Sequence, residues 1–134
     1  MTCRDWSNFW LNEGFTVFLE RKISGQRLGL EFSLIASQLG NTSLWADING
    51  YGVNNSYSSL FPQLNDGANP DDSFSEVAYE KGFQFLYYLE NQVMKTQKDF
   101  QDMLGFYINK YRNQSVTYLE FRLTFNEWIR KSYS

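Results

Sequence analysis

The chain has 134 residues, of which 43% are hydrophobic and 19% aromatic, so it holds enough apolar material for one packed core. It carries 12 Lys and Arg against 15 Asp and Glu, a net charge of −3, which argues against nucleic acid as a partner because such proteins present a basic face. No apolar run approaches the roughly 20 residues that span a bilayer, so no membrane partner is expected either.

The first element expected is a helix through residues 9–23. Apolar residues recur there mostly at steps of three and four, which is the spacing of one helix face. Asp5 or Ser7 offers an N-cap for it, because short polar side chains accept hydrogen bonds from the first free N–H groups. Gly25 and Gly29 weaken the helical pattern beyond this segment, so the first helix is expected to end there.

A second helix is expected from Leu30 to Leu39, with Gly40 as its stop, because glycine commonly ends helices. From 47 to 75 the chain is rich in Gly, Asn, Ser and Asp and contains both prolines. This composition predicts a loop, with at most a short helical turn near 44–48. A loop of this length inside a compact domain is usually functional.

Three more helices are expected in the remainder. One runs through 83–94, and a stripe of alternating three- and four-residue steps marks another through 100–111. Thr117 and Glu120 have capping-box spacing and introduce the last helix. No strand pattern is found, so the sequence predicts an all-α piece of about five helices. The side chains expected to face the core are Phe83, Leu86, Leu89, Val93, Met94, Phe100, Met103, Leu104, Tyr107, Ile108, Tyr111, Tyr118, Phe121, Phe125, Trp128 and Ile129.

Cysteine and aromatic content add two expectations. The single cysteine, Cys3, rules out a disulfide within the chain and favours a reducing compartment, and no signal peptide is apparent, so a cytoplasmic location is expected. The chain also contains 12 Phe, nine Tyr and four Trp, which is many for its length. Aromatic side chains normally fill interiors or interfaces, so part of the surface is expected to be covered by the remainder of a larger protein.

The first candidate for chemistry is Glu13, in the run FWLNEGFT at residues 9–16. A glutamate among aromatic side chains is costly to bury unless it is paired, hydrogen-bonded or bound to a cation. Glu20 lies seven residues further on, about two helical turns away and therefore on the same face. Two carboxylates on one face suit a metal ligand and the group that orients it. The alternative is a solvated, acidic helix face.

The second candidate is Tyr79, in the run VAYEKGF at residues 77–83. A tyrosine hydroxyl stays protonated far above neutral pH, so it can donate a hydrogen bond to a developing oxyanion. From the residue alone, a tyrosine of the core or of an interface remains the alternative.

Together and in this order, the two runs resemble segments of the gluzincin zinc aminopeptidases, the family of membrane alanyl aminopeptidase and leukotriene A hydrolase. The resemblance covers nearly the whole chain, to about Trp128, and amounts to a slice of the family's multidomain enzymes. It implies that residues 1–134 form one partial catalytic domain, within the C-terminal lobe of a thermolysin-like metallopeptidase. By this resemblance, Glu13 is the third zinc ligand beside two histidines, and Glu20 is the glutamate that supports it.

The resemblance also implies roles for Tyr79 and Asp71. Tyr79 would stabilise the intermediate that forms when the peptide bond is attacked. Asp71 lies in a segment that resembles the leukotriene hydrolase branch in particular, which implies that it recognises the N-terminal residue of a peptide substrate; a turn-forming aspartate is the alternative. Two departures from that branch are Ala78, in place of proline, and Phe74, in place of the tyrosine of the mammalian enzyme. Peptide hydrolysis is therefore better supported than epoxide hydrolysis.

The chain contains no histidine, so it cannot supply the family's His-Glu-x-x-His motif, which the family's spacing would place just before Met1. We therefore expect a fragment of a zinc metalloaminopeptidase whose partner is the N-terminal part of the enzyme. By itself it should bind Zn²⁺ weakly and be inactive, because zinc sites need three or four donors. The alternative is a catalytically inactive helical remnant that acts as a binding or interaction module.

Overall fold

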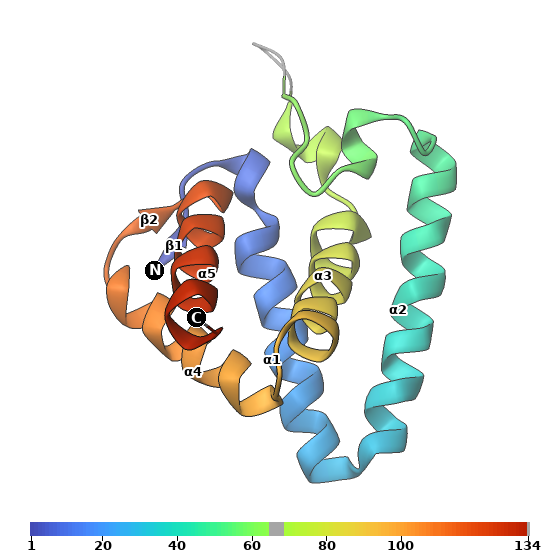
Figure 1. The fold of residues 1–134 in the computed structure, drawn as a ribbon. Coiled ribbons are helices and arrows are strands. Elements are labelled where there is room, and N and C mark those ends of the chain that lie inside the picture. The colour runs from blue at the N-terminus through green and yellow to red at the C-terminus, as the bar shows by residue number, and fades with distance from the viewer. Residues whose placement is uncertain (65–68, 134) are drawn as a thin grey trace.

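The computed structural model describes residues 1–64 and 69–133. Within them the chain forms five α-helices and two short strands, joined by single turns of tighter or wider helix (Figure 1). The all-α prediction is confirmed, whereas the prediction that no strand occurs is wrong. The helices are α1 (Trp10–Leu28), α2 (Leu30–Tyr51), α3 (Gly82–Tyr88), α4 (Gln97–Lys110) and α5 (Tyr118–Tyr133).

Helices α1 and α2 form a hairpin that turns at Gly29. This residue has a φ of 99°, a left-handed conformation that glycine adopts without strain, and its N–H closes the last turn of α1. Gly40 does not end the second helix as predicted, because α2 continues to Tyr51 and ends at Gly52, where φ is 95°. The predicted helical turn at 44–48 is therefore part of α2.

The segment between α2 and α3 is built from short turns, and it begins five residues later than the predicted loop. Two of them are 3-10 turns, η2 (Ser56–Ser58) and η3 (Pro70–Ser73). The third, η4 (Val77–Lys81), is a π-helical turn that runs directly into α3, and a second π turn, η5 (Leu89–Val93), follows α3. Residues 65–68 of the predicted loop lie outside the described residues.

The core lies where α1, α3, α4 and α5 meet, and aromatic rings form much of it. Most of the predicted stripe residues are buried or half-buried there, but Ile108 is 47% exposed and Val93 is 38% exposed. The stripe on α4 is thus narrower than predicted. The buried hydrophobic members of this core are Trp10, Leu11, Phe15, Phe18, Phe83, Leu86, Leu89, Met94, Phe100, Met103, Leu104, Tyr107, Val116 and Phe121.

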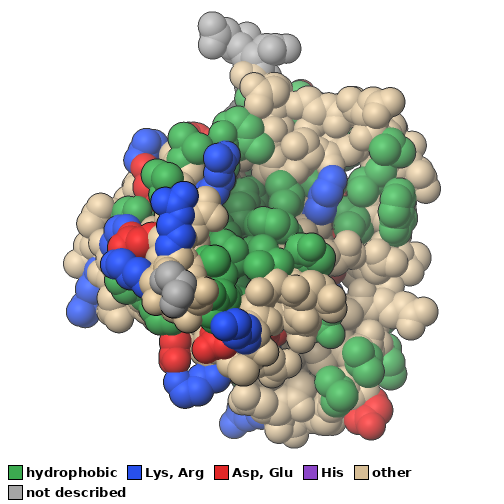
Figure 2. All heavy atoms as spheres, in the orientation of Figure 1, with side chains coloured by type: hydrophobic (Ala, Val, Ile, Leu, Met, Phe, Trp, Pro, Cys, Tyr) green, Lys and Arg blue, Asp and Glu red, His purple; other side chains and the backbone are tan. Residues whose placement is uncertain are grey.

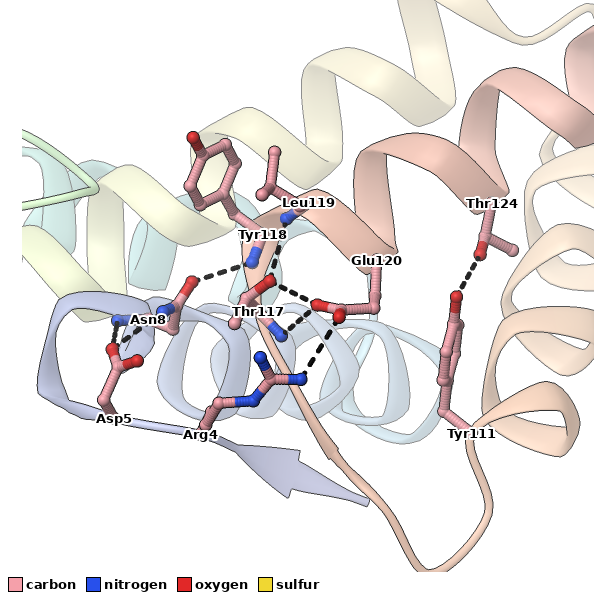
Figure 3. Close-up of polar contacts among 9 residues, drawn as sticks. All are labelled: Arg4, Asp5, Asn8, Tyr111, Thr117, Tyr118, Leu119, Glu120 and Thr124. Atoms are coloured by element: carbon pink, nitrogen blue, oxygen red, sulfur yellow. Dashed lines mark hydrogen bonds and ion pairs between the residues drawn. The ribbon is translucent and has the colours of Figure 1, made fainter.

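The N-terminal residues pair with the segment before α5. Strand β1 (Thr2–Cys3) runs parallel to β2 (Ser115–Val116), and two-residue strands are too short to show an alternating pattern in the sequence. Next to the strands, buried Asn8 accepts a hydrogen bond from the N–H of Tyr118 at 2.7 Å and donates one to Asp5 at 2.7 Å (Figure 3). The start of the chain is thereby held against the start of α5.

One of the two hydrogen bonds of the predicted capping box at α5 is present. The carboxylate of Glu120 accepts hydrogen bonds from both the N–H, at 2.8 Å, and the hydroxyl of Thr117, and it also pairs with Arg4 at 3.2 Å (Figure 3). Asp5, one of the two predicted N-caps, caps the short turn η1 (Trp6–Asn8) that leads into α1.

Helix α2 buries little of its apolar surface. Leu44 and Ile48 are buried, whereas hydrophobic side chains on the rest of the helix are exposed, and Figure 2 shows several of them on the surface over α2. Cover of this surface by a larger protein stays a prediction. Among the described residues, no helix combines the length and the apolar content that crossing a membrane requires. The large exposed hydrophobic side chains of α2 are Leu30, Phe32, Leu34, Ile35, Leu39 and Trp45.

Candidate active site

Glu13 lies in the first turn of α1 and is half-buried. Among the described residues, no hydrogen bond or ion pair reaches its carboxylate. Burial raises the pKa of Glu13 above its ordinary value of 4.5, because the charged form loses contact with water. A partly desolvated carboxylate without a partner is a group that a bound cation would satisfy.

Tyr79 lies in the π turn η4, with aromatic rings on two sides. Its ring centre is 6.1 Å from that of Phe9 and 5.9 Å from that of Phe74, both in edge-on contact. Burial raises the pKa of Tyr79, and the charges of Glu13 and Glu76 raise it further, so the hydroxyl is a donor at neutral pH. The residues beside them are in close contact, since a Cβ at Gly14 would lie 3.4 Å from the carbonyl oxygen of Ala78.

The two runs meet through their glycines. A Cβ at Gly14 would lie 2.7 Å from the Cα of Gly82, which is closer than real Cβ atoms come to any heavy atom. The backbones of α1 and α3 therefore approach each other directly at this point. Glu13 precedes this contact by one residue and Tyr79 by three, so the glycines set how far apart the two side chains lie.

Neighbouring residues in the same two runs have structural contacts. The amide oxygen of Asn12 accepts a hydrogen bond from the N–H of Cys3 at 2.9 Å and so connects α1 to β1. Glu80 is only 6% exposed and forms an ion pair with Arg21 at 2.7 Å. Each run thus offers one candidate for chemistry, Glu13 or Tyr79, beside residues that hold the two segments in place.

Asp71 and Glu20 are less closely connected to this pair. Asp71 is exposed in η3, where Asn69 and not Asp71 caps the turn by accepting a hydrogen bond from the Asp71 N–H at 3.2 Å. Its connection to the site runs through Phe74, whose ring contacts Tyr79. Glu20 is exposed on α1, and no hydrogen bond or ion pair of its carboxylate is found within the described residues. The roles assigned to all four residues stay predictions.

Glu13 fits one ligand position of a metal site and no more. Within residues 1–64 and 69–133, no three Cys, Asp or Glu side chains gather where they could hold a metal ion, and the sequence contains no histidine. Catalytic zinc is held by three protein ligands and keeps one position open. The other ligands would have to come from outside the described residues.

Arg21 and Gly40 are residues near the site that sequence reasoning missed. Arg21 forms the ion pair with Glu80, and Gly40 leaves the space that the Glu80 carboxylate occupies. A signal for the first was present, because Arg21 and Glu80 are opposite charges inside aromatic-rich runs, where buried charges are expected to be paired. Nothing in the sequence near Gly40 indicated its partner.

Comparisons with known proteins identify a family and related sequences. The model of the peptidase family M1 domain matches residues 1–133. Leucine aminopeptidase 2 of Aspergillus clavatus is 36% identical over 131 residues, which are 97% of this chain and 21% of that protein. Leukotriene A-4 hydrolase of Xenopus laevis is 40% identical over 122 residues, 91% of this chain and 20% of that protein.

Solved structures give the same result. The structure of native leukotriene A4 hydrolase from Saccharomyces cerevisiae is 34% identical and superposes with a TM-score of 0.90 over 98% of this chain and 21% of that one. The chain therefore spans about a fifth of the length of the relatives it matches.

Proposed function

Because the chain belongs to peptidase family M1, we propose that it forms part of the active site of a zinc aminopeptidase of the leukotriene A hydrolase branch. The observation that supports this most directly is the contact between the two runs that carry Glu13, an unpartnered carboxylate, and Tyr79, a protonated hydroxyl. The zinc histidines and the general base would be supplied by residues outside this chain. Within it, the predicted partial catalytic domain is residues 1–134.

Each candidate residue has a definite task in this proposal. Glu13 would be one zinc ligand, with Glu20 as its supporting carboxylate, and zinc in such a site activates a water molecule. Tyr79 would donate a hydrogen bond to the carbonyl oxygen of the scissile peptide bond as negative charge develops there. Asp71 would attract the positively charged N-terminal residue of the peptide. The predicted cytoplasmic location is part of the same proposal.

A chimaera tests the proposal. The segment of Aspergillus clavatus leucine aminopeptidase 2 that matches this chain is replaced by the present sequence, and hydrolysis of an aminoacyl p-nitroanilide cleaved by the host is measured together with zinc content. We expect activity with stoichiometric zinc. Glu13→Gln should remove the zinc and the activity.

Tyr79→Phe in the chimaera separates chemistry from folding. It should lower kcat by about 10²–10³, the usual value of one oxyanion donor, while zinc is retained. The matched control is Tyr87→Phe, because Tyr87 is an exposed tyrosine of α3. Unchanged turnover in Tyr79→Phe would remove the catalytic assignment. A well-folded, inactive chimaera would favour the alternative function, a helical interaction module.

A further inference from the structure

A buried ion pair involves the residue that follows Tyr79. The guanidinium of Arg21 donates two parallel hydrogen bonds to the carboxylate of Glu80, from Nη2 to Oε1 at 2.7 Å and from Nη1 to Oε2 at 2.8 Å. It also donates one to the carbonyl of Ala36 at 3.1 Å and lies 4.2 Å from the ring centre of Phe83. This one pair therefore joins α1, α2 and η4.

Stability alone is a weak reason for such a pair. The free-energy cost of removing two charges from water offsets much of their mutual attraction. Buried ion pairs are therefore often no more stabilising than apolar residues of the same size. A two-pronged arginine–carboxylate contact does fix the relative orientation of the segments that carry it. Here those segments are α1, which carries Glu13, and η4, which carries Tyr79.

Helix α2 makes room for this pair at Gly40. A Cβ there would lie 2.2 Å from the carboxyl carbon of Glu80 and 2.2 and 2.3 Å from its two oxygens. A side chain at position 40 would therefore push the carboxylate away from Arg21. Gly50 lies in the same helix, and a Cβ there would have no neighbour within 4 Å. A side chain at position 50 would therefore meet no obstacle.

The local backbone of Tyr79 needs such support. A π turn departs from regular helix geometry and often occurs at functional sites, and contacts outside the turn decide where its side chains lie. In η4 two of these contacts are polar and come from the residues after Tyr79. Glu80 pairs with Arg21, and Lys81 donates a hydrogen bond to the carbonyl of Ser58 at 2.7 Å.

We propose that the Arg21–Glu80 pair, seated against Gly40, positions the hydroxyl of Tyr79 relative to Glu13. The proposal rests on the proposed function and extends it by two positioning residues. Arg21 and Glu80 act through Tyr79 and are not assigned a contact with substrate or metal. Disturbing the pair should therefore lower kcat, with smaller effects on KM and zinc content.

Gly40→Ala in the chimaera tests this without changing any charge. Displacing a catalytic group by an ångström typically costs up to about 10²-fold in rate, so kcat should fall about 10- to 100-fold. The matched control Gly50→Ala should keep the original kcat. Adding Glu80→Asp to Gly40→Ala shortens the carboxylate by one methylene group, frees space for the new methyl group and should restore part of kcat.

The decisive comparison repeats Gly40→Ala in the Tyr79→Phe background. If the pair acts through the tyrosine hydroxyl, Gly40→Ala lowers kcat in the original chimaera and has little further effect once the hydroxyl is absent. An equal loss in both backgrounds, or no loss in either, would overturn the proposal while leaving the proposed function intact. If Tyr79→Phe alone does not lower kcat, the catalytic assignment of Tyr79 fails, and the present proposal fails with it. Should Gly40→Ala not fold, Arg21→Lys replaces it, since lysine keeps the charge and loses the two-pronged contact.

Discussion

Gly14 and Gly82 lie backbone against backbone where α1 crosses α3. The contact is reciprocal, because a Cβ at Gly82 would lie 2.8 Å from the Cα of Gly14. Backbone atoms form both sides, so neither helix can yield by rotating a side chain. The distance between Glu13 and Tyr79 therefore depends on a contact in which no side chain takes part.

Gly14→Ala should destabilise the fold by about 1–3 kcal/mol, the usual cost of forcing an additional methyl group into a packed contact. The matched control is Gly105→Ala, because Gly105 is exposed in α4 and its Cβ would meet nothing within 4 Å. Alanine favours a helix over glycine, so the control should gain up to about 1 kcal/mol. Urea titrations measure both free energies of unfolding. A stabilising effect of both substitutions would contradict the close approach.

Glu13→Gln should alter stability in a pH-dependent way. Burial raises the pKa of Glu13 in the folded chain, so the folded state binds this proton more tightly than the unfolded state, where the pKa is near 4.5. Its favourable contribution is therefore fully present below the unfolded value and is lost as pH rises through the raised folded value. In the metal-free chain, the substitution should increase the free energy of unfolding at neutral pH and change it little in acid.

Urea titrations across this pH range check the prediction. Glu20→Gln is the control for removing one carboxylate from α1, because Glu20 is exposed on the same helix. If Glu13→Gln lowered the free energy of unfolding at neutral pH, the carboxylate would have a stabilising partner in the chain, and its availability as a ligand would be in doubt.

Local signals in the sequence were enough to predict most of the helices. The helix through 100–111 and the Thr117–Glu120 contact both depend on residues within a few positions of one another. The helix is confirmed with a narrower apolar stripe than predicted, and one hydrogen bond of the capping box is present. Gly40 was misread as a helix stop because its reason for being glycine lies 40 residues away, in the carboxylate of Glu80. Contacts of that kind cannot be inferred from local pattern.

The candidate site likewise contains residues with a local signal in the sequence and residues whose partners are distant in the sequence. Glu13 and Tyr79 are identified because each lies in a run that resembles a family motif, and the two runs contact each other at Gly14 and Gly82. The Arg21–Glu80 pair spans 59 positions of sequence, and no periodicity connects the two charges. Asp71 is assigned to the site by resemblance alone, and it lies exposed in η3.

Glu127 should titrate in strong acid. It accepts hydrogen bonds from Lys110 at 2.7 Å and Lys131 at 2.6 Å, which lower the pKa of Glu127 to about 2. A lowered folded pKa means that the stabilising contribution is present above the unfolded value of 4.5 and is lost as pH falls from there to about 2. Carboxyl-carbon NMR gives the midpoint directly. The midpoint should rise towards the ordinary value of a glutamate in high salt, because salt screens exposed charges. It should also rise in Lys110→Met, which removes one of the two hydrogen-bond donors. An ordinary midpoint at low salt would contradict the two ion pairs of Glu127.

Thr96→Ala should weaken the start of α4 by about 1 kcal/mol, the typical value of an N-cap. The hydroxyl of Thr96 accepts a hydrogen bond from the Asp99 N–H at 3.1 Å, and the Asp99 carboxylate accepts one from the Thr96 N–H at 3.0 Å. The hydroxyl of Tyr133, at the end of α5, also lies 3.3 Å from this carboxylate, so the cap connects two helices. Thr96→Ser keeps the hydroxyl and should retain most of the stability. Equal losses in the serine and alanine variants, measured by urea titration, would mean that the methyl group of Thr96 and not its hydrogen bond supports the helix.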